Sequence, residues 1–279
     1  PLVRRVVDNI NATVMLSGTL SPLDAYELYI LGEEDRAKKI SLPNPFPAEN
    51  RLLMVAKTAT TQLEKRDEAG NRREITEHIE AIIEEVPGNV AVFFTSYSMM
   101  NQYEATCKAS ARRAGKMLYA EPRTAEDVPA LLDDFFRAGK RRGAVLLGVS
   151  GGKLAEGIDY KGEALNGVAV VGLPLGFYNE IQREVNQYYV RKYGQNRGML
   201  IAYTLPAINR GLQAAGRVIR DASERGVILF CDRRFREGGR GGVLSFLPRW
   251  IQDELIVTDA QKSREIIRGK VAKWEKLRS

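Results

Sequence analysis

Val90-Ala-Val-Phe-Phe94 is a run of five apolar residues that opens a regular alternation of apolar and amphipathic segments. Its length and its β-branched and aromatic residues predict a buried strand, and the amphipathic segment 98–114 predicts a helix after it. Apolar strands alternating with helices are typical of a parallel sheet covered on both faces, so we predict a doubly wound α/β fold. Outward from this stretch, further strands are predicted at 12–16, 51–56, 116–119, 144–149, 167–172, 199–204 and 227–231, and further helices at 23–31, 74–86, 124–137, 178–193 and 205–220.

The composition excludes several classes of protein. Of the 279 residues 44% are hydrophobic, as in ordinary globular proteins, and no apolar run approaches the roughly 20 residues that cross a bilayer. Cys107 and Cys231 cannot supply four ligands to zinc or to an iron–sulfur cluster, and the single histidine, His78, disfavours a Ser-His-Asp triad. We therefore predict no metal site, no membrane association and a reducing intracellular location: cytoplasm or nucleoid, or nucleus in a eukaryote.

The N-terminus and the charge distribution carry two further expectations. The first residues, Pro-Leu-Val-Arg-Arg, lack both Met and a signal-peptide profile, so we expect the chain to be part of a longer one. The net charge is +7, and basic clusters lie at 233–240 and 261–279. Such clusters favour a polyanionic partner such as nucleic acid. The second cluster is equally consistent with an amphipathic helix that packs its apolar residues on a core.

Two predicted strands run directly into loops suited to anions. Thr95-Ser96-Tyr97 follows the strand 90–94, where hydroxyls and backbone amides at a helix start bind anions, although a simple helix cap is an equal alternative. The loop 150–159, Ser-Gly-Gly-Lys-Leu-Ala-Glu-Gly-Ile-Asp, follows the strand 144–149. Its glycines and lysine suit a phosphate, but Leu154 after Lys153 excludes a Walker A loop. A glycine-rich turn with solvated charges is the alternative.

The third anion-suited segment is Gln213-Ala-Ala-Gly-Arg-Val-Ile-Arg220, predicted to lie in a helix capped by Thr204. At about 100° per residue, Gln213, Arg217 and Arg220 share one face beside Gly216. Guanidinium groups bind phosphate oxygens in a fixed fork, so this face predicts a phosphate site. A solvated basic helix face is the alternative.

Residues 67–70, Asp-Glu-Ala-Gly, imitate an acidic box for nucleotide hydrolysis. Such a box needs an apolar strand before it, and the polar segment 62–66 precedes this one. We interpret residues 58–73 as a long exposed segment.

Four motifs occur in order and together resemble motifs III to VI of superfamily 2 DNA helicases. Their residues resemble those of the XPD branch most, and those of DinG-type helicases second. They are Ser17-Gly-Thr-Leu-Ser-Pro22, Phe93-Phe-Thr-Ser-Tyr97, Gly152-Lys-Leu-Ala-Glu-Gly-Ile-Asp159 and Gln213-Ala-Ala-Gly-Arg-Val-Ile-Arg220. The segments 230–235 and 247–251 are also similar to that branch. The resemblance implies a RecA-like second motor domain that pairs with an absent first motor domain.

The resemblance also implies residue roles. Arg220 would be the arginine finger, with Arg217 and Gln213 on the same catalytic surface. The remaining ATP-side residues would be Gly216, Glu156, Gly157, Asp159, Gly18 and Thr19, with Ser17 in the same coupling motif. Single-stranded DNA would follow Thr95, Ser96, Tyr97, Ser150 and Lys153, and Tyr97, Phe177 and Tyr178 are candidate stacking residues that are alternatively core residues.

The expected organisation is a motif III segment with a linking helix (1–31), the motor domain (32–255) and a basic helical tail (256–279). ATP and Mg²⁺ would be shared with the first motor domain, which alone would carry an iron–sulfur cluster, so the isolated chain is expected to be inactive. A 5′-to-3′ polarity and a role in nucleotide excision repair are family implications. The alternatives are a DinG-type helicase half, a non-catalytic regulatory docking module, and a self-contained nucleotide-binding protein, which the absent P-loop opposes.

Overall fold

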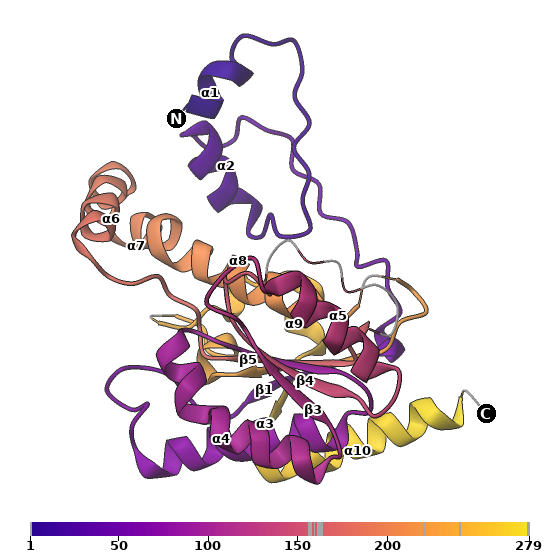
Figure 1. Cartoon of the computed structure of the whole chain (residues 1–279). Coiled ribbons are helices and arrows are strands. Elements are labelled where there is room, and N and C mark those ends of the chain that lie inside the picture. Colours follow the sequence, from indigo (N-terminus) through magenta and orange to yellow (C-terminus); the bar gives the residue numbers. More distant parts are fainter. Residues whose placement is uncertain are drawn as a thin grey trace.

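The computed structural model describes residues 2–155, 158, 160, 164–219, 221–239 and 241–277, and these form one seven-stranded sheet (Figure 1). All neighbouring strands are parallel, in the order β3-β4-β2-β5-β6-β1-β7. The doubly wound α/β prediction is confirmed. The strands are β1 (Arg51–Ala56), β2 (Val90–Phe94), β3 (Met117–Ala120), β4 (Ala144–Val149), β5 (Gly167–Val171), β6 (Gly226–Cys231) and β7 (Ile256–Thr258).

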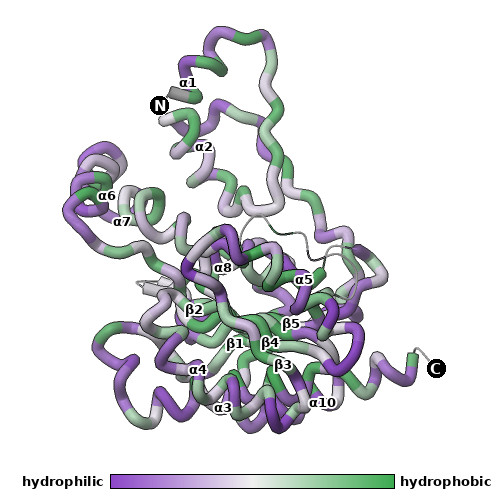
Figure 2. Tube along the Cα trace, viewed as in Figure 1, coloured by the Kyte–Doolittle hydropathy of each residue, from purple (hydrophilic) through white to green (hydrophobic). Residues whose placement is uncertain are grey.

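Helices cover both faces of the sheet, α3, α4 and α10 on one side and α5, α8 and α9 on the other (Figure 1). Alternate residues of a strand point to opposite faces, so Ala91 and Phe93 of β2 join one core cluster while Val92 and Phe94 join the other. Hydrophobic residues accordingly concentrate in the strands (Figure 2). The α-helices are α1 (Leu2–Val7), α2 (Leu23–Leu31), α3 (Ala69–Glu85), α4 (Tyr97–Arg113), α5 (Val128–Gly139), α6 (Glu180–Tyr193), α7 (Gln195–Met199), α8 (Leu205–Ala215), α9 (Arg249–Glu254) and α10 (Ala260–Lys276), with short 3₁₀ turns at Ala48–Asn50, Arg233–Phe235 and Leu244–Phe246.

The strand predicted at 12–16 is wrong. This segment has no regular secondary structure and pairs with no described strand, and Val14 and Leu16 are each 85% exposed. It runs between α1 and α2, away from both edges of the sheet (Figure 1). An apolar run becomes a strand only where a free sheet edge can hydrogen-bond to it, and no such edge lies beside this segment.

The strand predicted at 199–204 is also wrong, because this segment is helical. Residues 200–204 form a π-helical turn that connects α7 to α8, and Thr204 lies inside helical backbone instead of capping it. Pro206 has no N–H to donate to the carbonyl of Ala202, and the Gln182 side chain donates to that oxygen instead at 3.0 Å. A short apolar run does not distinguish a strand from a buried helix by periodicity.

The helix predicted across 213–220 ends at Ala215, five residues early. Gly216 caps it, and its N–H donates to the carbonyl of Leu212. Val218 is buried against the start of β6, where a Cβ on Gly226 would lie 1.9 Å from a Val218 methyl carbon. Glycine favours a helix end, and the packing of Val218 on Gly226 sets the path of the chain after it. Because Arg217 lies beyond the helix, Gln213 and Arg217 do not share a helical face.

The loop predicted at residues 58–73 is shorter and less exposed in the structure. Helix α3 begins at Ala69 instead of residue 74, and Ala59 and Thr60 are buried. Asp67, in the segment that imitates an acidic box, is on the surface and pairs there with Arg66 and Arg72. The buried part of this loop has a role at the sheet edge, described below.

The C-terminal segment packs within the same layers as the rest of the sheet. Strand β7 pairs with β1, and Ile267, Val271 and Trp274 of α10 are buried. Arg264 donates to Glu84 and Glu85 of α3, each at 2.8 Å. The amphipathic-helix alternative therefore describes this segment, and part of its positive charge is paired internally.

Glu27 of α2 holds the following loop by its carboxylate, which is almost fully buried. It accepts the backbone N–H groups of Ala37, Arg36 and Asp35 at 2.6, 2.7 and 3.1 Å, and the Lys39 ammonium at 3.0 Å. The Ala37 N–H and the Lys39 ammonium, followed by the other two N–H groups, lower the pKa of Glu27 to about 2.

We expect Glu27→Gln to lose stability relative to the wild type at pH 6 and to lose clearly less at pH 3. Because the folded pKa of about 2 lies below the ordinary value of 4.5, the charged form stabilises the fold above that value. This stabilisation disappears as the pH falls from about 4.5 towards 2. Urea denaturation at both pH values measures the difference, with the exposed Glu126→Gln as control. A difference that does not shrink at pH 3 contradicts the assignment.

Candidate functional site

The carboxyl ends of the parallel strands meet at one edge of the sheet, where such folds bind ligands. At this edge Gly172 directly follows β5 and has a φ of +93°. Two neighbouring loops pass close to its Cα atom. A Cβ there would lie 2.5 Å from the Thr61 hydroxyl oxygen and 2.7 Å from the Thr95 methyl carbon. The loops after β1, β2 and β5 therefore converge at Gly172.

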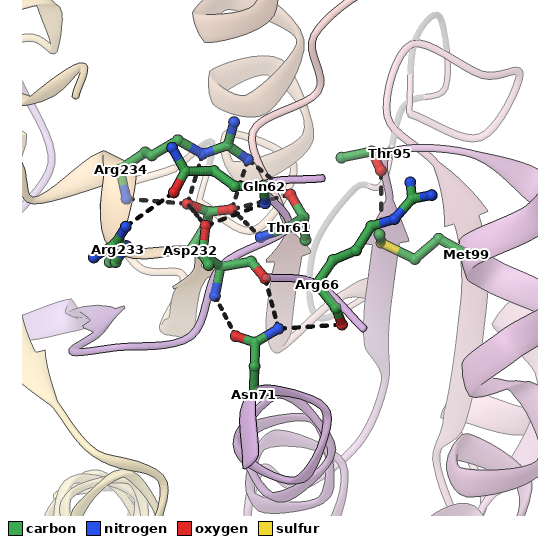
Figure 3. Close-up of polar contacts among 10 residues, drawn as sticks. Thr61, Gln62, Arg66, Asn71, Thr95, Met99, Asp232, Arg233 and Arg234 are labelled. Carbon is green, nitrogen blue, oxygen red and sulfur yellow. Dashed lines mark hydrogen bonds and ion pairs between the residues drawn. The ribbon is translucent and has the colours of Figure 1, made fainter. Parts of the chain in front are cut away.

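The residues after β2 that were predicted to bind single-stranded DNA form hydrogen bonds within the protein. Ser96 is the N-cap of α4, and its hydroxyl accepts the Met99 N–H at 3.2 Å. The Thr95 hydroxyl donates to the Met99 sulfur at 3.5 Å (Figure 3). The Tyr97 hydroxyl donates to Glu121 at 2.7 Å, and burial together with this carboxylate raises the pKa of Tyr97 to about 12. The capping alternative thus describes Ser96, and Tyr97 stays protonated.

Glu121, which the sequence analysis missed, joins three elements of this edge. It follows β3 directly, is buried, and accepts the Tyr97 hydroxyl, the Val149 N–H at 2.9 Å and the Lys153 N–H at 3.1 Å. A Cβ on Gly152 would lie 2.6 Å from its carboxylate, so glycine is required for this approach. The position of a glutamate immediately after an apolar strand was the available signal.

The loop after β4 begins as predicted, but its side chains are oriented inward. The Ser150 N–H donates to the Phe94 carbonyl at 2.8 Å, while the Ser150 hydroxyl is buried without a partner among the described residues. The Lys153 ammonium donates to the carbonyls of Pro122 and Arg123 at 3.3 and 2.8 Å. Its charge is therefore oriented towards the loop that follows β3. Glu156, Gly157 and Asp159 lie outside the described residues.

Arg217 connects the segment after α8 to the loop after β4. Its guanidinium donates to the carbonyl of Ala155 at 3.0 Å and to that of Ile158. Gln213 and Gly216 are exposed beside it, and Arg220 lies outside the described residues. The two motifs that the sequence separates by more than fifty residues are thus joined by one side chain.

Gly18 and Thr19 lie in the exposed turn before α2. The Ser17 hydroxyl oxygen accepts the Thr19 N–H at 3.2 Å, and a Cβ on Gly18 would meet nothing within 4 Å. No hydrogen bond within the described part of the chain joins them to Gln213 or Gly216.

A buried ion pair lies directly after β6 at this edge of the sheet. The Asp232 carboxylate accepts two guanidinium nitrogens of Arg234 at 2.9 and 2.7 Å, and the N–H and hydroxyl of Thr61 at 2.8 and 3.0 Å (Figure 3). Both charged side chains are almost completely buried. Burial raises the pKa of Asp232, but the bonds from Arg234 outweigh this effect and hold the pKa below its usual range. This pair connects β6 to the loop after β1.

No group of three or more His, Cys, Asp or Glu side chains among the described residues is arranged to hold a metal ion. No described helix is both long and apolar enough to span a membrane. Cys107 and Cys231 are both buried and unpaired, and burial raises the pKa of Cys107 to about 12.

Comparison with known proteins identifies the family. Residues 79–254 match the helicase C-terminal domain model. The chain is 28% identical over 263 residues to the general transcription and DNA repair factor IIH helicase subunit XPD of Arabidopsis thaliana, covering 91% of this chain and 34% of that protein. It is 26% identical over 277 residues to the ATP-dependent DNA helicase CHL1 of Meyerozyma guilliermondii, covering 91% and 33%. It therefore spans about a third of the length of these relatives.

Solved structures of XPD helicases confirm the predicted RecA-like fold. One superposes with a TM-score of 0.64 at 20% identity, covering 92% of this chain and 44% of that one. Xpd4 of S. tokodaii superposes with a TM-score of 0.59 at 19% identity, covering 91% and 46%. Because the family model matches well over half of its residues, this chain belongs to the helicase C-terminal domain family.

Proposed function

We propose that the chain is the second motor domain of an ATP-dependent DNA helicase of XPD type, acting with 5′-to-3′ polarity in DNA repair. The observation that carries this proposal is the bridge from Arg217 to the carbonyls of Ala155 and Ile158. It brings the arginine-rich segment and the glycine-rich loop onto one edge of the sheet. The XPD and CHL1 relatives, named as a DNA repair factor subunit and an ATP-dependent DNA helicase, support the same activity.

In this proposal the chain supplies half of an ATPase site. Arg220 serves as the arginine finger, Gln213 and Gly216 lie on the nucleotide side, and Arg217 supports the loop that contains Glu156, Gly157 and Asp159. Arg217 donates to two backbone carbonyls, so we assign it a positioning role in addition to its expected approach to the phosphate. Gly18 and Thr19 would couple the two motor domains.

The first motor domain would hold Mg²⁺ and the ATP phosphates. The described residues contain no group of three or more His, Cys, Asp or Glu side chains arranged to hold a metal ion, and the two cysteines are too few for an iron–sulfur cluster. As the family resemblance implies, this proposal assigns both the metal ion and any cluster to that domain. DNA would cross the edge near Thr95, Ser96, Tyr97, Ser150 and Lys153, and the present bonds of Tyr97, Ser96 and Lys153 limit their role to positioning or to backbone contacts.

The isolated chain is expected to hydrolyse no ATP, with or without oligo-dT, because an arginine finger accelerates phosphoryl transfer only when another domain holds the nucleotide. A phosphate-release assay on the pure chain, beside the complete protein, measures this. Turnover by the complete protein that oligo-dT stimulates, and none by the chain, is the expected result. Hydrolysis by the pure chain would falsify the assignment as half of a site.

The regulatory docking alternative depended on a free basic tail. In the structure, α10 buries Ile267, Val271 and Trp274 and pairs Arg264 with α3, which leaves less of it for a partner. Capture of a partner by the chain but not by a variant ending at residue 255 would revive this alternative, provided that the shortened variant folds.

A further inference from the structure

Arg210, which no motif of the sequence includes, lies between two loops of the candidate site. It comes from α8, and its guanidinium donates to the Pro174 carbonyl in the loop after β5 at 2.7 Å. Its Cδ would lie 2.9 Å from a Cβ on Gly151, in the loop after β4, and its second terminal nitrogen 3.7 Å from a Cβ on Gly176. Gly151 has a φ of +81°, and its lack of a side chain leaves room for the arginine.

The charge of Arg210 is unpaired within the described part of the chain. A guanidinium has five donors, and the Pro174 carbonyl takes one of them. Arg51, Arg113 and Arg234 each have a carboxylate within hydrogen-bonding distance, whereas no described carboxylate pairs with the half-buried Arg210. The hydroxyl of Ser150, which precedes Gly151 in the chain, is buried and also lacks a partner among the described residues. Unused donors of this kind suit an anion such as a phosphate.

The loop that Arg210 contacts presents an unpacked aromatic ring. Phe177 is 87% exposed and follows Gly176 directly. The loop is held in place, because Tyr203 donates to the Gly176 carbonyl at 2.9 Å and packs edge-on against Tyr178 at 5.6 Å. Of the three candidate stacking residues, Tyr97 is hydrogen-bonded to Glu121 and Tyr178 packs on Tyr203, so Phe177 has the freest ring.

We propose that Arg210 and Phe177 form a one-nucleotide subsite for single-stranded DNA, with the guanidinium on a backbone phosphate and the ring stacked on a base. Every base has a π face and every nucleotide a phosphate, so the subsite binds without regard to sequence. Continuity with the edge near Thr95 and Ser150, and the positive charge of Arg210, favour nucleic acid over an apolar protein segment. This inference depends on the DNA path in the proposed function and extends it to residues after β5 and in α8.

The test is fluorescence anisotropy of labelled oligo-dT with the 279-residue chain over a series of salt concentrations. Phe177→Ala is expected to weaken binding about 5- to 150-fold, the effect of losing one stacked base, while Phe177→Trp retains it. Arg210→Met is expected to reduce the log–log salt dependence by about 0.7, the value for one phosphate contact on a single strand, while Arg210→Lys preserves it. Exposed Arg112→Met on α4 and Met117→Ala at the opposite end of β3 are matched controls.

Each outcome separates this subsite from the DNA path as a whole. If the wild type fails to bind oligo-dT at low salt, the proposed DNA path is absent from this chain and the subsite with it. If the wild type binds and both Phe177→Ala and Arg210→Met bind equally well, the subsite alone is overturned. Weaker binding by Arg210→Met with an unchanged salt dependence assigns Arg210 to loop support and removes the phosphate contact. If polyglutamate displaces labelled oligo-dT from the wild type as effectively as unlabelled oligo-dT does, and Phe177→Ala has no effect, the surface binds an acidic protein segment instead.

Discussion

Replacement of Arg220 by alanine in the complete helicase is expected to lower ATP turnover by about 10³–10⁵ and to leave single-strand binding largely intact. A finger arginine stabilises the charge that develops on the transferred phosphoryl group, and this is its usual worth in rate. At about 1.4 kcal/mol for each factor of ten, the loss corresponds to roughly 4–7 kcal/mol of transition-state stabilisation. Steady-state phosphate release and oligo-dT anisotropy on the same preparations measure the two quantities.

Two further substitutions, Arg220→Lys and Arg217→Ala, distinguish a finger arginine from an arginine that only supports the structure. Arg220→Lys keeps the charge but loses the planar fork of donors, so it is expected to remain far below the wild type. Arg217→Ala removes the bonds to Ala155 and Ile158, so it is expected to lower both turnover and thermal stability. Exposed Arg112→Ala on α4 should change neither quantity. Turnover of Arg220→Ala within roughly tenfold of the wild type, well short of the finger's expected worth, would show that Arg220 is not the finger.

Removal of the Asp232 carboxylate is expected to destabilise the fold by about 3–5 kcal/mol, because Asp232→Ala leaves Arg234 charged and buried without its partner. Thr61 loses the acceptor of its N–H and of its hydroxyl in the same change. The free energy of unfolding from urea titrations measures the loss. Asp253→Ala provides the matched control, because the exposed Asp253–Arg249 pair, 3.0 Å apart, is worth at most about 1 kcal/mol.

A double variant and the pH dependence check the cause of this loss. Asp232→Leu combined with Arg234→Met buries no charge, so it should be more stable than Asp232→Ala alone. The pKa of Asp232 is held below its ordinary value of 3.8, so its stabilisation is present above that pH and disappears as the pH falls through the folded pKa. Equal losses for Asp232→Ala and Asp253→Ala would contradict a stabilising buried pair.

The strands of the sheet core were predictable because their signal is local. Runs such as 90–94 and 144–149 are apolar throughout, and a strand buried on both faces requires this. The apolar run 200–204 carries an equally strong signal but belongs to a helix. Its environment between α7 and α8, and the Gln182 amide on the Ala202 carbonyl, decide this difference through contacts with residues distant in sequence.

The sequence by itself determined the parallel sheet, the order of the four motifs and the sheet edge at which the loops after β2 and β4 lie. These follow from hydrophobic patterning and from the geometry of parallel strands, which need no knowledge of long-range partners. Only the tertiary structure decided how the polar side chains at that edge are used: Glu121 joining Tyr97 to Lys153, Arg217 bonded to the loop after β4, and Arg210 left without a described carboxylate. A hydrogen bond depends on atoms a few ångströms apart in space, and such pairs are separated here by tens of residues along the chain.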